Sequence, residues 1–343
     1  MTALTVYIII IVAIALLFDF SNGMNDAANS IATVVATRVL PLRLAVLWAA
    51  FFNFMAAFLF ETHVAATVGK GLVVGHIIDP HLILATLLAA IGWTLFCTHQ
   101  GLPISVSHAL IGALAGAAVV KGGFGALAWG KLETVVVFIV LSPLIGMLLA
   151  GILMVALTWI CWKQMPRKVD KVFRVLQLVS AAIYSLSHGL NDAQKTMGII
   201  LALLLSVPSL QHYATRDGTP DGPLAWWIIL SCQAAIALGT YAGGTKVIKT
   251  LGHRVTKLQP FDGFAAETGG GVTILFLSML GIPVSTTHTI TGAIFGVGMT
   301  RRMSNVRWSV GADIATAWLL TLPAAAAASA LTYSIIRFVV NLF

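Results

Sequence analysis

The sequence is poor in charged residues and in cysteine, and each shortage excludes a class of protein. Only 9% of its 343 residues are charged and its mean hydropathy is +0.95, whereas a soluble domain carries about 25% charged residues. The three cysteines are scattered within apolar segments, so they provide neither a disulfide framework nor a metal site. Apolar segments of about 17 to 30 residues recur along the whole chain, which predicts an all-α polytopic membrane protein in a lipid bilayer.

Acidic residues are also scarce, with 12 against 20 basic ones and a net charge of +8. In a soluble domain this excess would suggest a nucleic-acid partner. Here the basic residues lie in short loops, where a positive excess marks the cytoplasmic side of a membrane, so the charge predicts topology and no nucleic-acid binding. The segments that we assign to the cytoplasmic side are 38–43, 163–174, 246–257 and 301–307, and those assigned to the outside are 66–82 and 121–131.

Two motifs occur twice in the same order, which indicates an internal duplication. "SNGMNDAANS" at 21–30 matches "SHGLNDAQKT" at 187–196, with an offset of 166 residues. "GLPISVSHALIGALAG" at 101–116 matches "GIPVSTTHTITGAIFG" at 281–296, with an offset of 180 residues. We therefore divide the chain into three parts, which are a first repeat, 1–162, a basic cytoplasmic linker, 163–174, and a second repeat, 175–343.

Each repeat is predicted to contain the same series of helices. A hairpin that returns to its own side leaves three crossings in each repeat, so the two repeats have inverted topology. At 1.5 Å per residue the motif helices exceed a bilayer core of about 30 Å, and we expect each to be broken at its Asn-Gly or Gly-x-Asn-Asp step. The series is a motif helix (3–37 and 172–206), a second helix (42–66 and 224–244), a re-entrant helical hairpin (83–119 and 263–299) and a closing helix (132–162 and 307–341).

The hairpin tips, "PISVSH" and "PVSTTH", place hydroxyl groups beside the free N–H groups that begin a helix. A helix start suits an oxyanion, and two of them facing each other would form a cage for a small tetrahedral anion without a buried arginine. A purely structural role for any single hydroxyl stays open, because Ser and Thr also stabilise helix contacts in membranes. The candidate anion-binding residues of the tips are Ser105, Val106, Ser107, Ser285, Thr286 and Thr287.

The Asn-Asp motifs are suited to a cation. Carboxylate and amide oxygens, together with carbonyls freed by a helix break, are hard ligands for Na⁺, and an acid can instead take a proton. We expect Na⁺ or a proton at Asp26 and Asp192; the alternative is a polar contact that only holds helices together. The candidate cation-binding residues are Asn25, Asp26, Asn29, Asn191, Asp192 and Glu267.

Four further residues are candidates for a modulating role: Gln194, Lys195, His108 and His288. Lys195 stands where the first motif has Asn29, so it could act as a fixed cation and make the two cation sites unequal. The two tip histidines could relay protons near neutral pH or simply be satisfied by hydrogen bonds. His188 and Asp192 are four residues apart, but the sequence shows no further ligands that would complete a zinc site with them.

The two Asn-Asp motifs resemble the paired Gly-x-Asn-Asp signatures of the PiT-type inorganic phosphate transporters. "LPISVSH" and "IPVSTTH" resemble the hairpin tips of that family, and the short linker is similar to that of its compact bacterial members. The resemblance implies symport of inorganic phosphate across the bacterial cytoplasmic membrane. The coupling ion is Na⁺ in some members; in others it is the proton, and phosphate is taken up as a neutral complex with a divalent metal. No cofactor is implied beyond these transported ions.

Carried over position by position, the phosphate contacts would fall on the hydroxyl residues of the tips. The cation contacts would fall on the Asn-Asp residues, with Glu267 at an acidic position of the family. The sequence departs from the family at Asn53, where some eukaryotic relatives have glutamate, and at Val106, which interrupts a run of hydroxyls. Lys195 replaces an asparagine of eukaryotic relatives. These departures leave the coupling ion and its stoichiometry open, and a homodimer stays open as well.

Three other functions are kept as alternatives to a phosphate symporter that works by alternating access. The first is a symporter of another oxyanion such as sulfate, which the same cage would fit. The second is an anion channel, although broken paired helices favour a carrier. The third is an intramembrane enzyme, for which the spacing of Ser, His and Asp fixes no nucleophile and base. We expect a transporter and no enzymatic activity.

Overall fold

The computed structural model of the chain describes residues 2–59, 61–243, 247, 258–301 and 306–342. Within these ranges the regular elements are helices, and strand-like pairing is confined to two isolated bridges, Val73–Leu127 and Thr215–Leu224. The all-α prediction is confirmed. The predicted loop 246–257, apart from Val247, and residues 302–305 of the predicted loop 301–307 lie outside the described residues.

The helices follow one another in the predicted order in both repeats. Those of the first repeat are α1 (Ala3–Ala36), α2 (Leu42–Met55), α3 (His63–Gly71), α4 (Pro80–Gln100), α5 (Val106–Gly122) and α6 (Trp129–Cys161). Those of the second are α7 (Pro166–Leu205), α8 (Trp226–Ala242), α10 (Pro260–Met279), α11 (Thr286–Arg301) and α12 (Trp308–Val340).

Four of these helices, α1, α4, α6 and α12, are long and apolar enough to cross a membrane. The closing helices α6 and α12 expose large apolar side chains, with Ile152 57% and Leu331 64% exposed. In water such a surface would be costly, whereas it fits contact with lipid. The chain is therefore an integral membrane protein.

The predicted hairpins are α4–α5 and α10–α11. In each, a glycine with positive φ follows the first arm, Gly101 at 73° and Gly281 at 71°, a conformation that residues with a side chain rarely adopt. A short segment then leads to Ser105 and Ser285, whose hydroxyls accept a hydrogen bond from the backbone N–H three residues later, at 3.2 Å in both tips. These serines are N-caps that start the second arms.

The structure corrects the predicted break in the motif helices, because α1 and α7 run without interruption through their motifs. The motif glycines serve close packing instead. A Cβ on Gly23 would lie 2.2 Å from the carbonyl oxygen of Ile236, and one on Gly189 would lie 2.5 Å from that of Asn53. Small residues allow such close approach of membrane helices. Since the motif backbone is helical, it frees no carbonyl groups to bind an ion, contrary to the prediction.

The predicted second helix, 42–66, is also different. The chain bends by 79° between Leu42–Phe58 and His63–Gly71, so that α3 is a separate short helix. The Gln194 side chain, from the motif of α7, accepts hydrogen bonds from the backbone N–H groups of Val64 and Ala65 at 2.8 and 3.2 Å. It thereby satisfies orphan donors at the start of α3. The bend between α2 and α3 therefore lies beside the second motif, whose own helix, α7, is unbroken.

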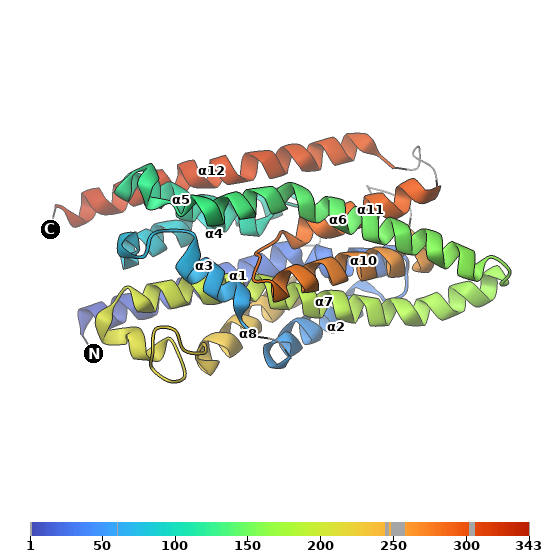
Figure 1. The fold of residues 1–343 in the computed structure, drawn as a ribbon, viewed down its shortest axis with the longest axis horizontal. Coiled ribbons are helices and arrows are strands. Elements are labelled where there is room, and N and C mark those ends of the chain that lie inside the picture. Colours follow the sequence, from blue (N-terminus) through green and yellow to red (C-terminus); the bar gives the residue numbers. More distant parts are fainter. Residues whose placement is uncertain (1, 60, 244–246, 248–257, 302–305, 343) are drawn as a thin grey trace.

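Helices of each repeat pack against helices of the other repeat along the length of the bundle (Figure 1). Motif helix α1 packs against α8 of the second repeat, and α7 packs against α2 and α3 of the first. The second arms of the hairpins behave in the same way, since α5 packs against α12 and α11 packs against α6. Equivalent helices thus make equivalent contacts, which is the pattern that a duplicated chain would produce.

The hairpins approach the middle of the bundle from opposite ends of α1 (Figure 1). The open end of the first hairpin lies beside the start of α1, where the Tyr7 hydroxyl is 2.7 Å from Nδ1 of His81. The open end of the second lies beside the end of α1, because Gln177 accepts a hydrogen bond from Thr37 at 2.8 Å and packs against Gly263. The tips therefore meet near the middle of α1.

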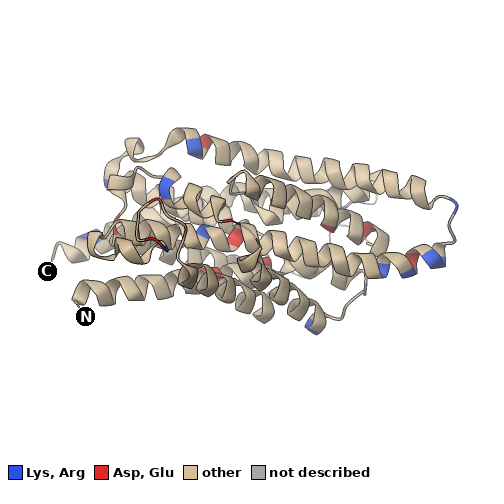
Figure 2. Cartoon of the chain, turned by 60° about the horizontal axis from the view of Figure 1, so that its bottom comes forward, with Lys and Arg blue, Asp and Glu red and all other residues tan. Residues whose placement is uncertain are grey.

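Charged residues lie mainly toward the two ends of the bundle (Figure 2). At one end Lys121 pairs with Asp79, which joins the two segments predicted to be outside. At the other end Arg174 donates to the carbonyl oxygen of Arg38 at 3.0 Å, which joins two segments predicted to be cytoplasmic. The basic segment 163–174 contains the turn after α6 and the first turns of α7.

Candidate functional site

The two hairpin tips meet through a matched pair of contacts. The Ser107 hydroxyl donates to the carbonyl oxygen of Val284 at 3.4 Å, and the Thr287 hydroxyl donates to that of Ile104 at 3.0 Å. Ser107 and Thr287 are equivalent positions of the duplication, as are Ile104 and Val284. Each tip thus makes the same contact with the other, and the tips lie together as the duplication predicts.

The hydroxyl groups of the tips divide into two sets. Ser105 and Ser285 act as the N-caps of α5 and α11, so their hydroxyl oxygens already have a structural partner. Ser107, Thr286 and Thr287 lie one and two residues further on, in the first turn of each arm. All five side chains are buried. A direct ligand role is therefore better supported for the second set than for the capping serines.

The start of each second arm also presents backbone donors. Val106 and Ser107 in α5, like Thr286 and Thr287 in α11, occupy the first two helical positions, whose N–H groups have no acceptor within their own helix. Val106 has an apolar side chain, so only its N–H group can contact an anion. Because the tips touch, the positive ends of two helix dipoles lie close together.

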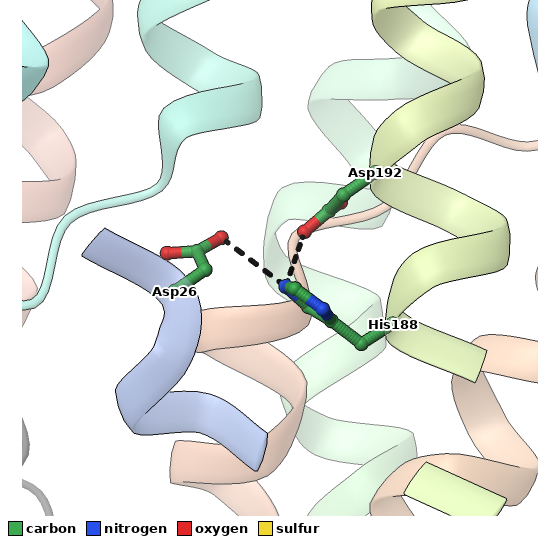
Figure 3. A group of neighbouring side chains, drawn as sticks. All are labelled: Asp26, His188 and Asp192. Carbon is green, nitrogen blue, oxygen red and sulfur yellow. Dashed lines mark ion pairs between the residues drawn. The ribbon is translucent and has the colours of Figure 1, made fainter. Parts of the chain in front are cut away.

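Two carboxylates and a histidine form a buried group beside the tips (Figure 3). Asp26 comes from α1, and His188 and Asp192 come from α7. Nε2 of His188 lies 3.1 Å from a carboxylate oxygen of Asp192 and 3.9 Å from one of Asp26. The three ligand atoms lie within 4.8 Å of one another. This corrects the sequence prediction that His188 and Asp192 lack a further ligand, because Asp26 of the other repeat supplies one.

The tip threonines connect this acidic group to the second hairpin. The Thr286 hydroxyl lies 2.9 Å from a carboxylate oxygen of Asp192 and 3.4 Å from one of Asp26. The Thr287 hydroxyl lies 3.3 Å from Asp26 and accepts a hydrogen bond from Asn29 at 2.9 Å. Hydroxyls of a hairpin tip and carboxylates of both motifs therefore belong to one site.

Lys195 brings a positive charge into the same site. It is 2% exposed, and its Nζ donates to Ser107 at 2.5 Å and to the carbonyl oxygen of Val284 at 2.7 Å. It also forms an ion pair with Asp192, as a fixed cation in this position could. The equivalent residue in α1, Asn29, is neutral. The two carboxylates therefore have unequal surroundings, and only Asp192 has a permanent cationic partner.

The remaining motif amides tie the motif helices to the first arms of the hairpins. Nδ2 of Asn25 donates to Thr98 at 2.7 Å, and Nδ2 of Asn191 donates to Ser278 at 2.6 Å. Thr98 and Ser278 are equivalent positions. The Oδ1 atoms of Asn25, Asn191 and Asn29 have no hydrogen-bond partner within the described ranges. These amide oxygens are therefore free to accept a ligand.

Glu267 lies in a different polar cluster. Its carboxylate accepts hydrogen bonds from Thr33 and Ser180 at 2.5 Å and from Gln177 at 3.0 Å. It is completely buried, on the side of the tips where the second hairpin opens. The sequence predicted a site role beside the Asn-Asp residues, whereas the structure gives Glu267 three donors of its own.

The other predicted modulating residues make no hydrogen bond or ion pair with these carboxylates within the described residues. Gln194 caps α3. The rings of His108 and His288 contact each other edge to face, with centroids 4.5 Å apart, and His288 stacks on Trp318 at 3.6 Å. Nδ1 of His288 lies 3.4 Å from the carbonyl oxygen of Ile139. These contacts fit the structural role that the sequence left open for the histidines.

Two residues that support the site, Tyr184 and Asn53, were not predicted from the sequence to be site residues. The Tyr184 hydroxyl donates to the carbonyl oxygen of Thr286 at 3.2 Å, and Oδ1 of Asn53 lies 3.2 Å from Nδ1 of His188. Tyr184, His188 and Asp192 are spaced by four residues, which places them on one face of α7 and is the signal that could have identified Tyr184. In the sequence, Asn53 is distinguished only as a departure from the family pattern.

The chain is similar to known proteins over nearly its whole length. A model of the phosphate transporter family matches residues 22–329. A probable low-affinity inorganic phosphate transporter of Rhizobium meliloti (strain 1021) is 52% identical over 323 residues, which cover 94% of each chain. A protein of the same name from Bacillus subtilis (strain 168) is 39% identical over 346 residues, covering 99% of this chain and all of the other. These names are those of transporters, in agreement with the prediction that the chain is not an enzyme.

A solved structure described as the sodium-dependent phosphate transporter has the same fold. It superposes with a TM-score of 0.87 at 28% identity, over 97% of this chain and 99% of the other. The match includes both hairpins and both motif helices, since it spans nearly the whole chain. The family match, the two bacterial relatives and the common fold agree with one another. The chain belongs to the phosphate transporter family.

Proposed function

We propose that the protein is a secondary active transporter that carries inorganic phosphate, together with a cation, across the cytoplasmic membrane of a bacterium. The observation on which this depends is that the tips of two hairpins from opposite ends of the bundle and the carboxylates of both motifs share one buried site. The names of the relatives support phosphate as the substrate. The solved sodium-dependent structure supports Na⁺ as the cation.

The charges of the site give a reason for joint binding. With both carboxylates ionised and His188 neutral, Asp26 and Asp192 contribute two negative charges and Lys195 contributes one positive charge. A phosphate anion would therefore enter a site that is already negative, at a depth where charge is costly. A cation that binds beside Asp26 would remove this repulsion, and each ion would lower the desolvation cost of the other.

Phosphate would bind at the starts of α5 and α11, where the N–H groups of Val106 and Thr286 and the hydroxyls of Ser107 and Thr287 can donate to its oxygens. Ser105 and Ser285 would keep the two helix starts in shape. The Thr286 hydroxyl now donates to Asp192. A phosphate oxygen would take over this donor, so phosphate binding would weaken a contact between the second hairpin and α7.

The cation would bind between Asp26 and Asp192, with Oδ1 of Asn29 as a further ligand. Oxygen ligands of this kind suit Na⁺. His188 makes a divalent metal bound to phosphate the main alternative, because a histidine with two carboxylates is a ligand set for such metals. Asn25 and Asn191 would position the motif helices against the hairpins, and Glu267 would be a second acidic group on the route.

Transport would follow from two repeats of inverted topology. The repeats 1–162 and 175–343 would each contribute one hairpin, and the unit that carries both hairpins would rock against the longer helices. The site would then open alternately to either side of the membrane, with the segment 163–174 on the cytoplasmic side.

The experiment is uptake of labelled phosphate into proteoliposomes under separately imposed gradients of Na⁺, protons and Mg²⁺. The expected result is uptake against a phosphate gradient that is driven by one of the three and only weakly reduced by excess sulfate. Strong competition by sulfate would indicate a different oxyanion as substrate. Equal downhill flux without any cation gradient would indicate a channel and contradict coupled transport.

A further inference from the structure

Asp19 is a buried acid that takes no part in the site described above. It lies on α1 and is 0% exposed. Neither of its carboxylate oxygens has a hydrogen-bond partner among the residues that the structure describes. Asp192 and Glu267, by contrast, each accept a hydrogen bond from a hydroxyl group, and a carboxylate oxygen of Asp26 lies 3.3 Å from the Thr287 hydroxyl. Burying an ionised carboxylate without a partner inside a membrane protein is costly, so Asp19 requires a partner.

Two further unpartnered oxygens lie next to this carboxylate. Asn22, one turn later on α1, and Thr196 of α7 lie close enough to Asp19 to act on its carboxylate, although neither makes a hydrogen bond of normal length and angle with it. Both are buried. Oδ1 of Asn22 and Oγ1 of Thr196 also lack a hydrogen-bond partner in the described part of the chain. Three side chains from two helices thus contribute four buried oxygen atoms, and none of the four has a hydrogen bond of normal geometry within the described residues.

This group is separate from the central site, although it lies on the same face of α1. Asp19 precedes Asp26 by seven residues, or about two turns and about 10 Å along the helix axis, so one ion cannot be ligated by both. The duplication offers a comparison. The position equivalent to Asp19 in α7 is Ser185, whose hydroxyl donates to the carbonyl oxygen of Ala181 at 2.8 Å. The unpaired acid is therefore a feature of the first repeat.

We propose that Asp19, Asn22 and Thr196 form a binding site for a Na⁺ ion that is distinct from the central site. A single proton on Asp19 would complete one hydrogen bond and leave the other oxygens without a partner, whereas a bound cation can be shared by several oxygen ligands at once. Oxygen ligands select hard cations over softer transition metals. One carboxylate with two neutral oxygen ligands balances the charge of a monovalent ion and not that of a divalent one.

The place of the site along α1 gives it a role in transport. Asp19 lies near the midpoint of α1 and nearer to its start than Asp26 does, on the side of the central site where the first hairpin opens; that side is predicted to face outside. An ion at Asp19 would lie about two helical turns from the central site. This role rests on the proposed function, whereas the existence of the site does not.

The test counts the Na⁺ ions bound to the purified full-length chain at equilibrium, with labelled sodium and without phosphate. The wild type binds one more ion per chain than Asp19→Asn. Thr196→Val keeps this ion but binds it with about tenfold lower affinity, as expected for the loss of one contact. Ser185→Ala, at the equivalent position of the second repeat, binds Na⁺ like the wild type. Addition of Na⁺ also raises the Tm of the wild type by more than that of Asp19→Asn.

The inference is wrong if Asp19→Asn binds as many Na⁺ ions as the wild type and its Tm responds equally to Na⁺, because Asp19 then carries a proton. If Asp19→Asn does not fold, Thr196→Val decides, and an unchanged Na⁺ affinity overturns the site. Phosphate uptake is absent from these measurements. A failure of the transport proposal would therefore leave the ion counts unaffected, and the two outcomes can be told apart.

Discussion

The motif helices α1 and α7 are copies of one segment that keep the same packing but carry different charges. Gly23 and Gly189 both touch a backbone carbonyl of the facing helix, and Asp26 and Asp192 both reach the same tip. In contrast, Lys195 of α7 corresponds to a neutral asparagine in α1. The duplication is therefore symmetric in shape and asymmetric in electrostatics.

This difference assigns unequal tasks to the two copies. Asp192 is neutralised by Lys195 within the protein. Asp26 lies near the Thr287 hydroxyl and His188 and forms no ion pair with a lysine or arginine among the described residues, and Asp19 has no hydrogen bond of normal geometry there. Under the proposed function, the acids of α1 therefore depend on ions from solution more than the acid of α7 does. A chain built in this way can retain a symmetric framework for movement while it binds its cations mainly on one side.

The largest effect is expected from removing the acid that has its own counter-charge. Asp192→Asn leaves the Lys195 ammonium buried without its ion pair, so we expect a loss of about 3 kcal/mol in the free energy of unfolding. Phosphate uptake should fall about 100-fold or more, which corresponds to about 2.7 kcal/mol. Asp26→Asn should reduce uptake as strongly with little change in Tm. Equal losses of stability in the two variants would contradict the proposed inequality.

Lys195→Asn makes the second motif resemble the first and should give the next largest effect. Asp192 then needs a cation from solution, so the dependence of uptake on cation concentration should become steeper, because one more cation has to bind before transport. Uptake at graded Na⁺ and proton concentrations measures this. Lys70→Asn, at the end of the bundle, is the matched control and should behave like the wild type. Unchanged phosphate affinity and unchanged ion dependence in Lys195→Asn would refute the role of the lysine.

The shared packing can be tested by adding a methyl group on each side. Gly23→Ala and Gly189→Ala each place a Cβ within 2.5 Å of a backbone carbonyl oxygen, and both should lose about 1–3 kcal/mol of stability because of overpacking. Gly92→Ala in α4 is the control, since a Cβ there meets nothing within 4 Å. Thermal unfolding in detergent is the measurement. If only one motif variant is destabilised, the packing symmetry is incorrect.

The capping serines should give the smallest effects, and equal ones. Ser105→Ala and Ser285→Ala each remove an N-cap hydrogen bond, which is worth about 1 kcal/mol, so phosphate affinity should fall only a few-fold. Thr286→Val removes a hydroxyl that contacts both carboxylates and should reduce affinity more. A serine variant as inactive as Thr286→Val would show that the capping serines bind phosphate directly.

The hairpins could be predicted from the sequence because local chemistry specifies them. Gly281 supplies a positive φ, Pro283 follows within the turn, and Ser285 caps the next helix. Each of these effects acts over a few residues, so that the order of letters is enough to place the turn. The meeting of the two tips followed from the duplication, which the repeated motifs make visible.

The motif helices could not be predicted in the same way. Asn-Gly is compatible with a break, and only the facing carbonyl of Ile236 shows that Gly23 is a packing residue. Gln194 was grouped with the ion site because of its position in the motif, yet it caps a helix whose position is set by tertiary structure. Glu267 likewise finds its donors on α1 and α7. The roles of Gly23, Gln194 and Glu267 are therefore set by partners that are distant in the sequence.

The most direct measurement is the affinity of the purified protein for phosphate with and without the coupling cation, and for that cation with and without phosphate. Shared occupation of one buried site predicts that each ligand raises the affinity for the other about tenfold or more, and by the same factor, because coupling between binding sites is reciprocal. Affinities that are independent of each other would contradict a site in which the carboxylates and the hairpin tips hold an anion and a cation together.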